Sequence, residues 1–103
     1  MLEIIETTLQ LAKEKFEKFG FKEEQVSQLI ESGRKDLEQE ISKLKDILHS
    51  SDIDMKVLND SLHALKGLLL NMGNNKIADK LIELKNSDDT QLKIEQIKSI
   101  FKF

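Results

Sequence analysis

Apolar residues recur at steps of three and four along most of this chain, which is the spacing of an amphipathic helix. A first series consists of Ile5, Leu9, Ala12, Phe16 and Phe19. A second and longer series consists of Val26, Ile30, Gly33, Leu37, Ile41, Leu44 and Leu48. These series predict one helix over residues 2–19 and another over residues 22–48.

Two glycines mark special points in this pattern. Gly20 is expected to end the first helix, because glycine tolerates the left-handed backbone that follows a last turn, and Phe21 is placed to make the accompanying apolar contact. Gly33 lies on the apolar stripe of the second helix. Close approach of another helix is its expected role, and a kink is the alternative. Phe16, Phe19 and Phe21 are expected in the core.

A third helix is predicted over residues 54–72. The segment "HSSDIDMK" interrupts the apolar pattern before it. Ser51 with Asp54 resembles a capping box, which marks the start of a helix. "GNN", starting at Gly73, ends it, because Gly and Asn both tolerate left-handed geometry.

Two shorter helices complete the chain. The fourth, over residues 75–86, carries Ile77, Leu81 and Leu84. The segment "NSDD" forms a turn with Ser87 or Asp88 as the N-cap, and a fifth helix is predicted over residues 88–102.

No stretch of useful length alternates between apolar and polar residues as a strand does, so the predicted fold class is all-α. Short loops favour antiparallel neighbours. We expect a single domain over residues 1–103, folded as an up-and-down antiparallel four-helix bundle with an additional N-terminal helix, five helices in all.

Composition narrows the possible functions. The chain has 16 Lys and Arg residues against 19 Asp and Glu residues, and no cysteine. Disulfides, thiolate metal sites and a cysteine nucleophile are excluded. The sequence contains no cluster of Lys and Arg residues of the kind that binds nucleic-acid phosphates. Its longest uncharged stretch is far shorter than the ~20 apolar residues of a membrane span. We therefore expect a soluble protein with neither nucleic acid nor membrane as its partner. The absence of cysteine is compatible with a reducing cytosol, and the expected location is the cytoplasm.

Candidate chemistry centres on His63, in the segment "SLHALKGLLLNMG". A helix turns by roughly 100° per residue. On that basis the far half of the third helix carries Leu58, Leu62, Leu65, Leu69 and Met72. The face within about 60° of the histidine carries Lys56, Asn59, Asp60, Lys66, Gly67 and Asn74. His63 is therefore expected at the surface.

An exposed histidine on an amphipathic helix has two interpretations. It is a solvated side chain like its neighbours, or it is an accessible imidazole whose surroundings suit an anion. Lys66 is spaced to place its ammonium beside a phosphoryl group. Gly67 leaves clearance for a partner, and a glycine inside a helix costs about 1 kcal/mol relative to alanine. Leu70 is an apolar residue on the same face and is a candidate docking contact.

The second histidine, His49, falls near the C-terminal end of the long helix, where the helix dipole favours a cation. It is expected to be solvated. A metal site joining the two histidines is not expected, because neither a ligand spacing nor a carboxylate partner accompanies them.

The order of His63, Lys66, Gly67 and Gly73 resembles the signature of histidine-containing phosphotransfer (HPt) domains. In that family a lysine follows the histidine by three residues, a glycine by four and a second glycine by ten, with apolar residues such as Leu65 between. The segment "QLIESGRKDLEQEISKLKDIL" resembles the helix that precedes the histidine helix in the family. The likeness covers most of residues 22–86.

This resemblance implies a role in a phosphorelay. His63 would accept a phosphoryl group from a receiver-domain aspartate or a histidine kinase relay and pass it to a response-regulator receiver. Lys66 would stabilise the phosphoryl charge, Gly67 would give clearance, and Gly73 would be structural. The chain would bind no cofactor, with Mg²⁺ held by the receiver. It would be a monomeric carrier with a phosphohistidine intermediate rather than a self-contained kinase.

The resemblance also implies a docking surface for the receiver and the kinase, comprising Lys56, Asn59, Asp60, Leu70 and Asn74. The family usually has small residues five to seven positions after the histidine, where this chain has Leu68, Leu69 and Leu70, and Asn74 replaces a frequent alanine. A module that docks a receiver or kinase without carrying phosphate is therefore the alternative function. A purely structural or oligomerising helical protein is a third.

Overall fold

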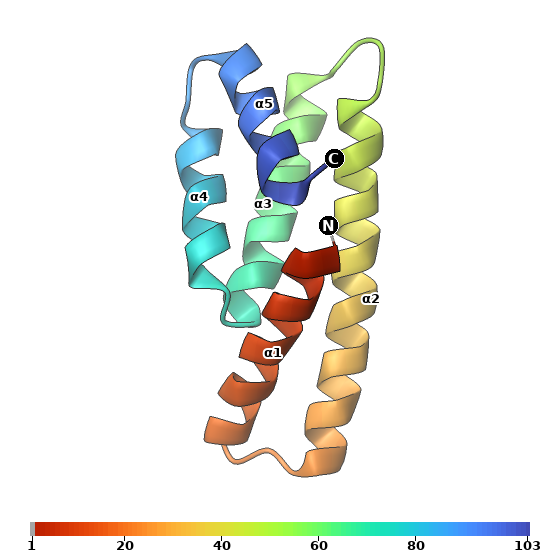
Figure 1. The fold of residues 1–103 in the computed structure, drawn as a ribbon, viewed down its shortest axis with the longest axis vertical. Coiled ribbons are helices and arrows are strands. Elements are labelled where there is room, and N and C mark those ends of the chain that lie inside the picture. Colours follow the sequence, from red (N-terminus) through yellow and green to blue (C-terminus); the bar gives the residue numbers. More distant parts are fainter. Residues whose placement is uncertain (1) are drawn as a thin grey trace.

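The computed structural model describes residues 2–103. They form five α-helices: α1 (Leu2–Lys18), α2 (Glu23–Leu48), α3 (Met55–Asn71), α4 (Asn75–Lys85) and α5 (Thr90–Phe101). No strand occurs in this range, and consecutive helices pack antiparallel (Figure 1). The predicted all-α class and the five helices are confirmed. Their ends lie within two residues of the predicted ones, as is common for helix ends.

The helices form an elongated body with principal extents of 45 × 21 × 21 Å. Helix α3 packs mainly against α2 and α4. Helices α1 and α5 follow one another along one side of the molecule (Figure 1). An ion pair between Glu3 of α1 and Lys102, just after α5, joins the ends at which they meet. The α1–α2 hairpin reaches well beyond the turn between α3 and α4.

All five helices contribute to one apolar core. Its fully buried large side chains include Ile5, Leu37, Ile41, Leu44, Leu58, Leu62, Leu65, Leu69, Leu81, Ile97 and Phe101. Each such side chain contributes roughly 1.5–3 kcal/mol of transfer free energy. The buried apolar residues of α2 and α3 all lie on the predicted apolar stripes, so the helical periodicity identified the core face of both helices.

The end of α1 is built as the sequence predicts. Gly20 has a φ of 83°. Its N–H donates to the Glu17 carbonyl at 3.0 Å, and the Phe21 N–H donates to the Phe16 carbonyl at 3.3 Å. The rings of Phe16 and Phe21 meet edge to face, with centroids 6.1 Å apart. This pattern of two hydrogen bonds and one apolar contact is the Schellman motif.

The expected core position of the phenylalanines is wrong for two of them. Phe19 is 69% exposed and Phe21 is exposed as well, whereas Phe16 is half-buried. The reason is the overhang of the α1–α2 hairpin, whose tip extends past α3 and has no third helix to cover it. At the other terminus Phe101 is fully buried and stacks on Phe103, with ring centroids 5.5 Å apart.

Two predicted helix caps also need correction. The N-cap of α3 is Asp54, whose carboxylate accepts the N–H groups of Lys56 at 2.9 Å and Val57 at 3.3 Å. Ser51 takes no part in it. The N-cap of α5 is Asp89, which accepts the Leu92 N–H, so neither Ser87 nor Asp88 has that role. Asp and Ser both accept such hydrogen bonds well, so the residue type alone did not identify which candidate is the N-cap.

Gly33 allows a close helix approach, as predicted. A Cβ built on it would lie 2.5 Å from Cε of Met72, the residue after α3. Helix α2 continues without interruption from Glu23 to Leu48. The small residue therefore makes room for a side chain at the end of α3.

Candidate functional site

His63 lies in the middle of α3 with its side chain exposed. The opposite side of the helix supplies Leu58, Leu62, Leu65 and Leu69 to the core. No residue of the described chain makes a hydrogen bond or an ion pair with the imidazole. The predicted surface position of His63 is confirmed, and both ring nitrogens are left to solvent or to a partner.

Lys66 follows on the next turn and is half-buried. Its ammonium, like the imidazole, has no hydrogen-bonding or ion-pairing partner among residues 2–103. Side chains on a helix lean toward its N-terminus, so that of Lys66 leans toward the turn that carries His63. An uncompensated positive charge beside an exposed imidazole suits an anion.

Gly67 has no packing role inside the molecule. A Cβ built on it meets no atom within 4 Å. Glycine at an interior helix position costs about 1 kcal/mol relative to alanine, and here the fold gains nothing in return. The backbone at Gly67 therefore lies next to open space, one turn beyond His63.

Gly73 has a structural role. Its φ is 85°, and its N–H donates to the Leu70 carbonyl at 3.1 Å, while the Asn74 N–H donates to the Leu69 carbonyl at 2.8 Å. These bonds close α3 with a second Schellman motif. Lys15 of α1 adds a further cap, because its ammonium donates to the carbonyls of Leu70 and Asn71 at 3.3 and 3.0 Å.

The face around His63 is not symmetrically exposed. Lys56 and Asp60 are exposed, and Leu70 is 38% exposed, as the proposed docking surface requires. Two apolar residues that the sequence analysis did not select, Val57 and Ala64, are also exposed. On the other flank Asn59 and Lys66 are half-buried. The open surface is thus displaced toward Ala64 and includes more apolar area than the sequence suggested.

The position expected for Asn74 is wrong. It is only 3% exposed, and its Nδ2 donates to Oγ1 of Thr8 at 2.8 Å. Its Oδ1 accepts the Ile77 N–H and caps α4. Asn74 lies past the end of α3, so helical angles counted from His63 do not apply to it. It joins α1 to α4 and does not belong to the docking surface.

One residue near this site was missed. Lys93 of α5 is 2% exposed, and its ammonium donates to Oδ1 of Asn59 at 2.6 Å and to the Lys85 carbonyl at 3.4 Å. Burial, and then the charge of Lys85, lower the pKa of Lys93 from its ordinary value. A signal was present in the sequence, because Lys93 lies four residues before buried Ile97, on the apolar stripe of its helix.

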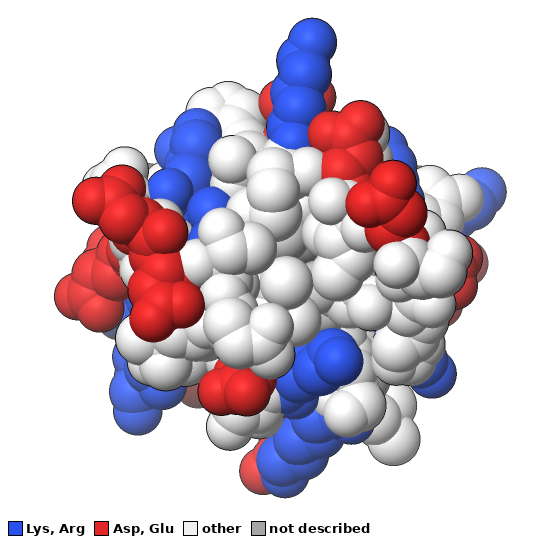
Figure 2. All heavy atoms as spheres, turned by 90° about the horizontal axis from the view of Figure 1, so that it is seen from above, with Lys and Arg blue, Asp and Glu red and all other residues white. Residues whose placement is uncertain are grey.

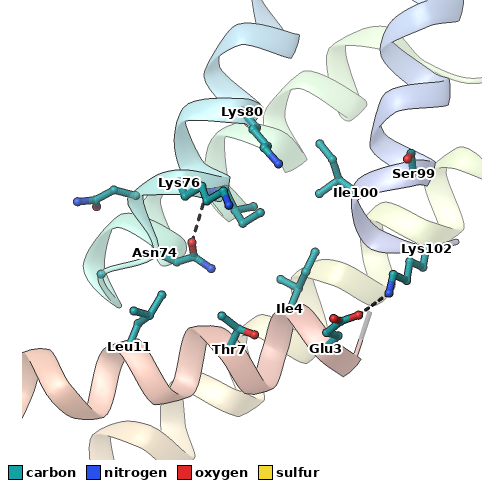
Figure 3. Close-up of a pocket in the computed structure, with 13 residues that line it drawn as sticks. Glu3, Ile4, Thr7, Leu11, Asn74, Lys76, Lys80, Ser99, Ile100 and Lys102 are labelled. Atoms are coloured by element: carbon teal, nitrogen blue, oxygen red, sulfur yellow. Dashed lines mark hydrogen bonds and ion pairs between the residues drawn. The ribbon is translucent and has the colours of Figure 1, made fainter.

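A hollow lies elsewhere, between α1, the start of α4 and the end of α5 (Figure 3). Its volume is about 730 Å³, and none of its lining residues belongs to α3. Lys76 and Lys80 line it from α4 and Ile4 lines it from α1, while Lys102 is paired with Glu3 at its rim. It is therefore separate from the His63 surface.

Charged side chains do not gather at the end of the molecule that Figure 2 shows. Seen from above, acidic and basic side chains alternate around an uncharged middle (Figure 2). In the described range, no group of three or more His, Cys, Asp or Glu residues is arranged to hold a metal ion. Over the same range, no helix is both long enough and apolar enough to cross a membrane.

Comparison with known proteins leaves the chain without an assigned relative. No protein-family model, no curated protein and no solved structure matches it. The chemistry available on the described surface of α3 is an exposed imidazole, an unpaired ammonium one turn away and a glycine that faces open space.

Proposed function

We propose that the protein is a phosphorelay carrier of the HPt type, with His63 as the phosphoacceptor. The observation that carries this proposal is the surface of α3, where His63 is exposed and unpaired, Lys66 has no counter-charge and Gly67 faces open space. Each of these features suits a nucleophile that must meet a second protein. A solvated histidine of no function accounts for the first feature but not for the glycine.

The chemistry is a transfer between two nucleophiles. A receiver donates the phosphoryl group from its aspartyl phosphate: the P–O bond to the aspartate breaks, and a P–N bond forms at Nε2 of His63. The imidazole proton is released, and the aspartate leaves as a carboxylate. Transfer to the next receiver reverses these steps. The receiver supplies Mg²⁺, and Lys66 offsets charge on the phosphoryl oxygens, which is the main task in phosphoryl transfer.

The arrangement of the helices supports the same proposal. We propose that α2, α3 and α4 form three sides of an antiparallel four-helix bundle and that α1 and α5 together form the fourth side. Such a bundle holds the imidazole on a rigid helix, which suits a group that must be presented in one geometry. We propose a monomer that works in the cytoplasm, with a histidine kinase and a response-regulator receiver as partners.

An alternative is a module that docks a receiver or kinase without carrying phosphate. The exposed apolar residues of α3, Leu70 at 38% and Val57 at 40%, favour it. They increase the apolar area available for docking. A bulky Leu70 also narrows the approach to His63.

The test is incubation with phosphorylated receivers of the source organism. The relay role predicts a label on the protein that is acid-labile and base-stable, as phosphohistidine is. His63→Gln should abolish the label and keep the fold. His49→Gln is the matched control, because His49 is also exposed and lies at the end of α2.

The outcomes separate the two functions. Labelling that survives His63→Gln would exclude the relay role. Stable binding to a receiver with no transfer in either direction would favour the docking module. A stable oligomer in solution, with neither binding nor transfer, would favour a structural role instead.

A further inference from the structure

A buried ammonium lies against the face that carries His63. Lys93 is 2% exposed, and the groups that accept hydrogen bonds from its Nζ are the Asn59 amide oxygen and the Lys85 carbonyl. No ion pair in the described part of the chain includes it. Charged groups are rarely buried with neutral acceptors alone, because desolvation disfavours the ion. The arrangement therefore calls for an explanation.

Lys93 determines which way the Asn59 amide faces. An ammonium has donors only, so the atom 2.6 Å from it must be the amide oxygen. The Nδ2 group is consequently turned away from Lys93. In the described residues, the buried side-chain N and O atoms that lack a hydrogen-bond partner are Glu40 Oε2 and Ser61 Oγ. Nδ2 of Asn59 is thus unpaired but reaches solvent.

This unpaired donor lies one helical turn before His63. Residues four apart on a helix have Cβ atoms about 5–6 Å apart. Helical side chains lean toward the N-terminus, so the His63 ring leans over the turn that holds Asn59. By helical geometry Asn59 and Lys66 lie on the same side of His63, at roughly 40° and 60° from it. The acidic Asp60 lies on the other side.

We propose that Asn59, held in orientation by Lys93, donates a hydrogen bond to the phosphoryl group on His63. Asn59 and Lys66 then bind phosphoryl oxygens from one flank, and Lys93 is a positioning residue that does not touch the phosphate. This inference rests on the proposed function. It adds a second donor to the phosphoryl oxygens, beside Lys66. It also gives a role to the buried Lys93, which is not part of the sequence signature.

The test uses phosphoramidate, a small phosphodonor that needs no protein partner. Nε2 of His63 attacks its phosphorus, the P–N bond of phosphoramidate breaks, and ammonia leaves with the imidazole proton. In the unaltered protein, the Asn59 side-chain amide resonances should shift when His63 becomes phosphorylated. Those of Asn71, an exposed asparagine two turns beyond His63, should not.

Substitutions give a kinetic readout. Asn59→Asp replaces the donor by a negative charge and keeps an acceptor for Lys93. It should slow phosphorylation of His63 about tenfold, equivalent to about 1.4 kcal/mol. Asn71→Asp adds the same charge to the same helix and should change the rate less than twofold. Lys93→Met frees the Asn59 side-chain amide to rotate. It should therefore remove the change in the Asn59 amide resonances that accompanies phosphorylation of His63.

Two results would overturn the inference in different ways. Phosphorylation of His63 at equal rates in the wild type and Asn59→Asp, with no Asn59 shift, would disprove the role of Asn59 and leave the relay role standing. Failure of phosphoramidate to modify His63 would remove the proposed function together with this inference. If Lys93→Met does not fold, the change in the Asn59 amide resonances of the unaltered protein on phosphorylation still tests the role of Asn59.

Discussion

The methyl group of Met72 fills the space that a side chain at Gly33 would need. A Cβ at position 33 would lie 2.5 Å from Cε and 3.2 Å from Sδ of Met72. Met72 is itself buried, and it connects the end of α3 to the middle of the long helix α2. Because Met72 directly follows α3, this contact ties the end of the histidine-bearing helix to α2.

Gly33→Val should lower the free energy of unfolding by about 1–3 kcal/mol, the usual cost of overpacking. Met72→Ala removes the obstructing side chain but leaves a cavity, so by itself it should also destabilise. In the double variant the valine fills that space, and the cost should be smaller than the sum of the two single costs. Urea unfolding of the four proteins measures this. Strict additivity would show that the two side chains do not compete.

Gly67→Ala should have opposite effects on stability and function. Since a Cβ there meets nothing within 4 Å, alanine should raise the free energy of unfolding by about 0.5–1 kcal/mol through helix propensity. On the proposed function it should slow transfer from a phosphorylated receiver, because it fills the clearance beside His63. Thermal unfolding and a transfer assay on one preparation test both effects. Unchanged transfer would mean that the clearance is not used.

Asn74→Ala should destabilise the protein by about 1–3 kcal/mol. It removes the N-cap of α4 and leaves the buried Thr8 hydroxyl without its donor. Asn75→Ala is the control, because Asn75 is the exposed next residue. It should have an effect within about 0.5 kcal/mol, as surface substitutions usually do. Equal effects in chemical denaturation would contradict the buried role assigned to Asn74.

The buried lysine predicts a pH dependence of stability. The pKa of Lys93 in the folded protein lies below its ordinary value of 10.5, chiefly because of burial. Between the two values the unfolded chain holds more protons than the folded one, so the free energy of unfolding rises with pH across that interval. Below the interval the cost of the buried ammonium is present in full.

Lys93→Met removes this titration. The wild type should therefore gain stability relative to Lys93→Met as pH increases through the interval toward 10.5. Unfolding by urea at a series of pH values measures the difference. Lys98→Met, on the same helix but with a side chain that is only half-buried, is the control. A difference between wild type and Lys93→Met that stays constant with pH would argue against a lowered pKa.

What the sequence determined by itself is local. Helix geometry repeats every few residues, so apolar spacing identified the five helices, the buried face of α3 and the exposed position of His63. The left-handed backbone after Gly20 and Gly73 was equally predictable, because it depends on the glycine and on hydrogen bonds within a single turn.

Only the tertiary structure decided which residues are covered by parts of the chain that are distant in sequence. Asn74 is buried because the chain turns after α3 and brings it to Thr8. Asn59 is half-buried because α5 returns across α3 and places Lys93 on it. Phe19 is exposed because the α1–α2 hairpin extends beyond its neighbours. Burial of this kind depends on long-range packing, which the spacing of residues along one helix does not encode.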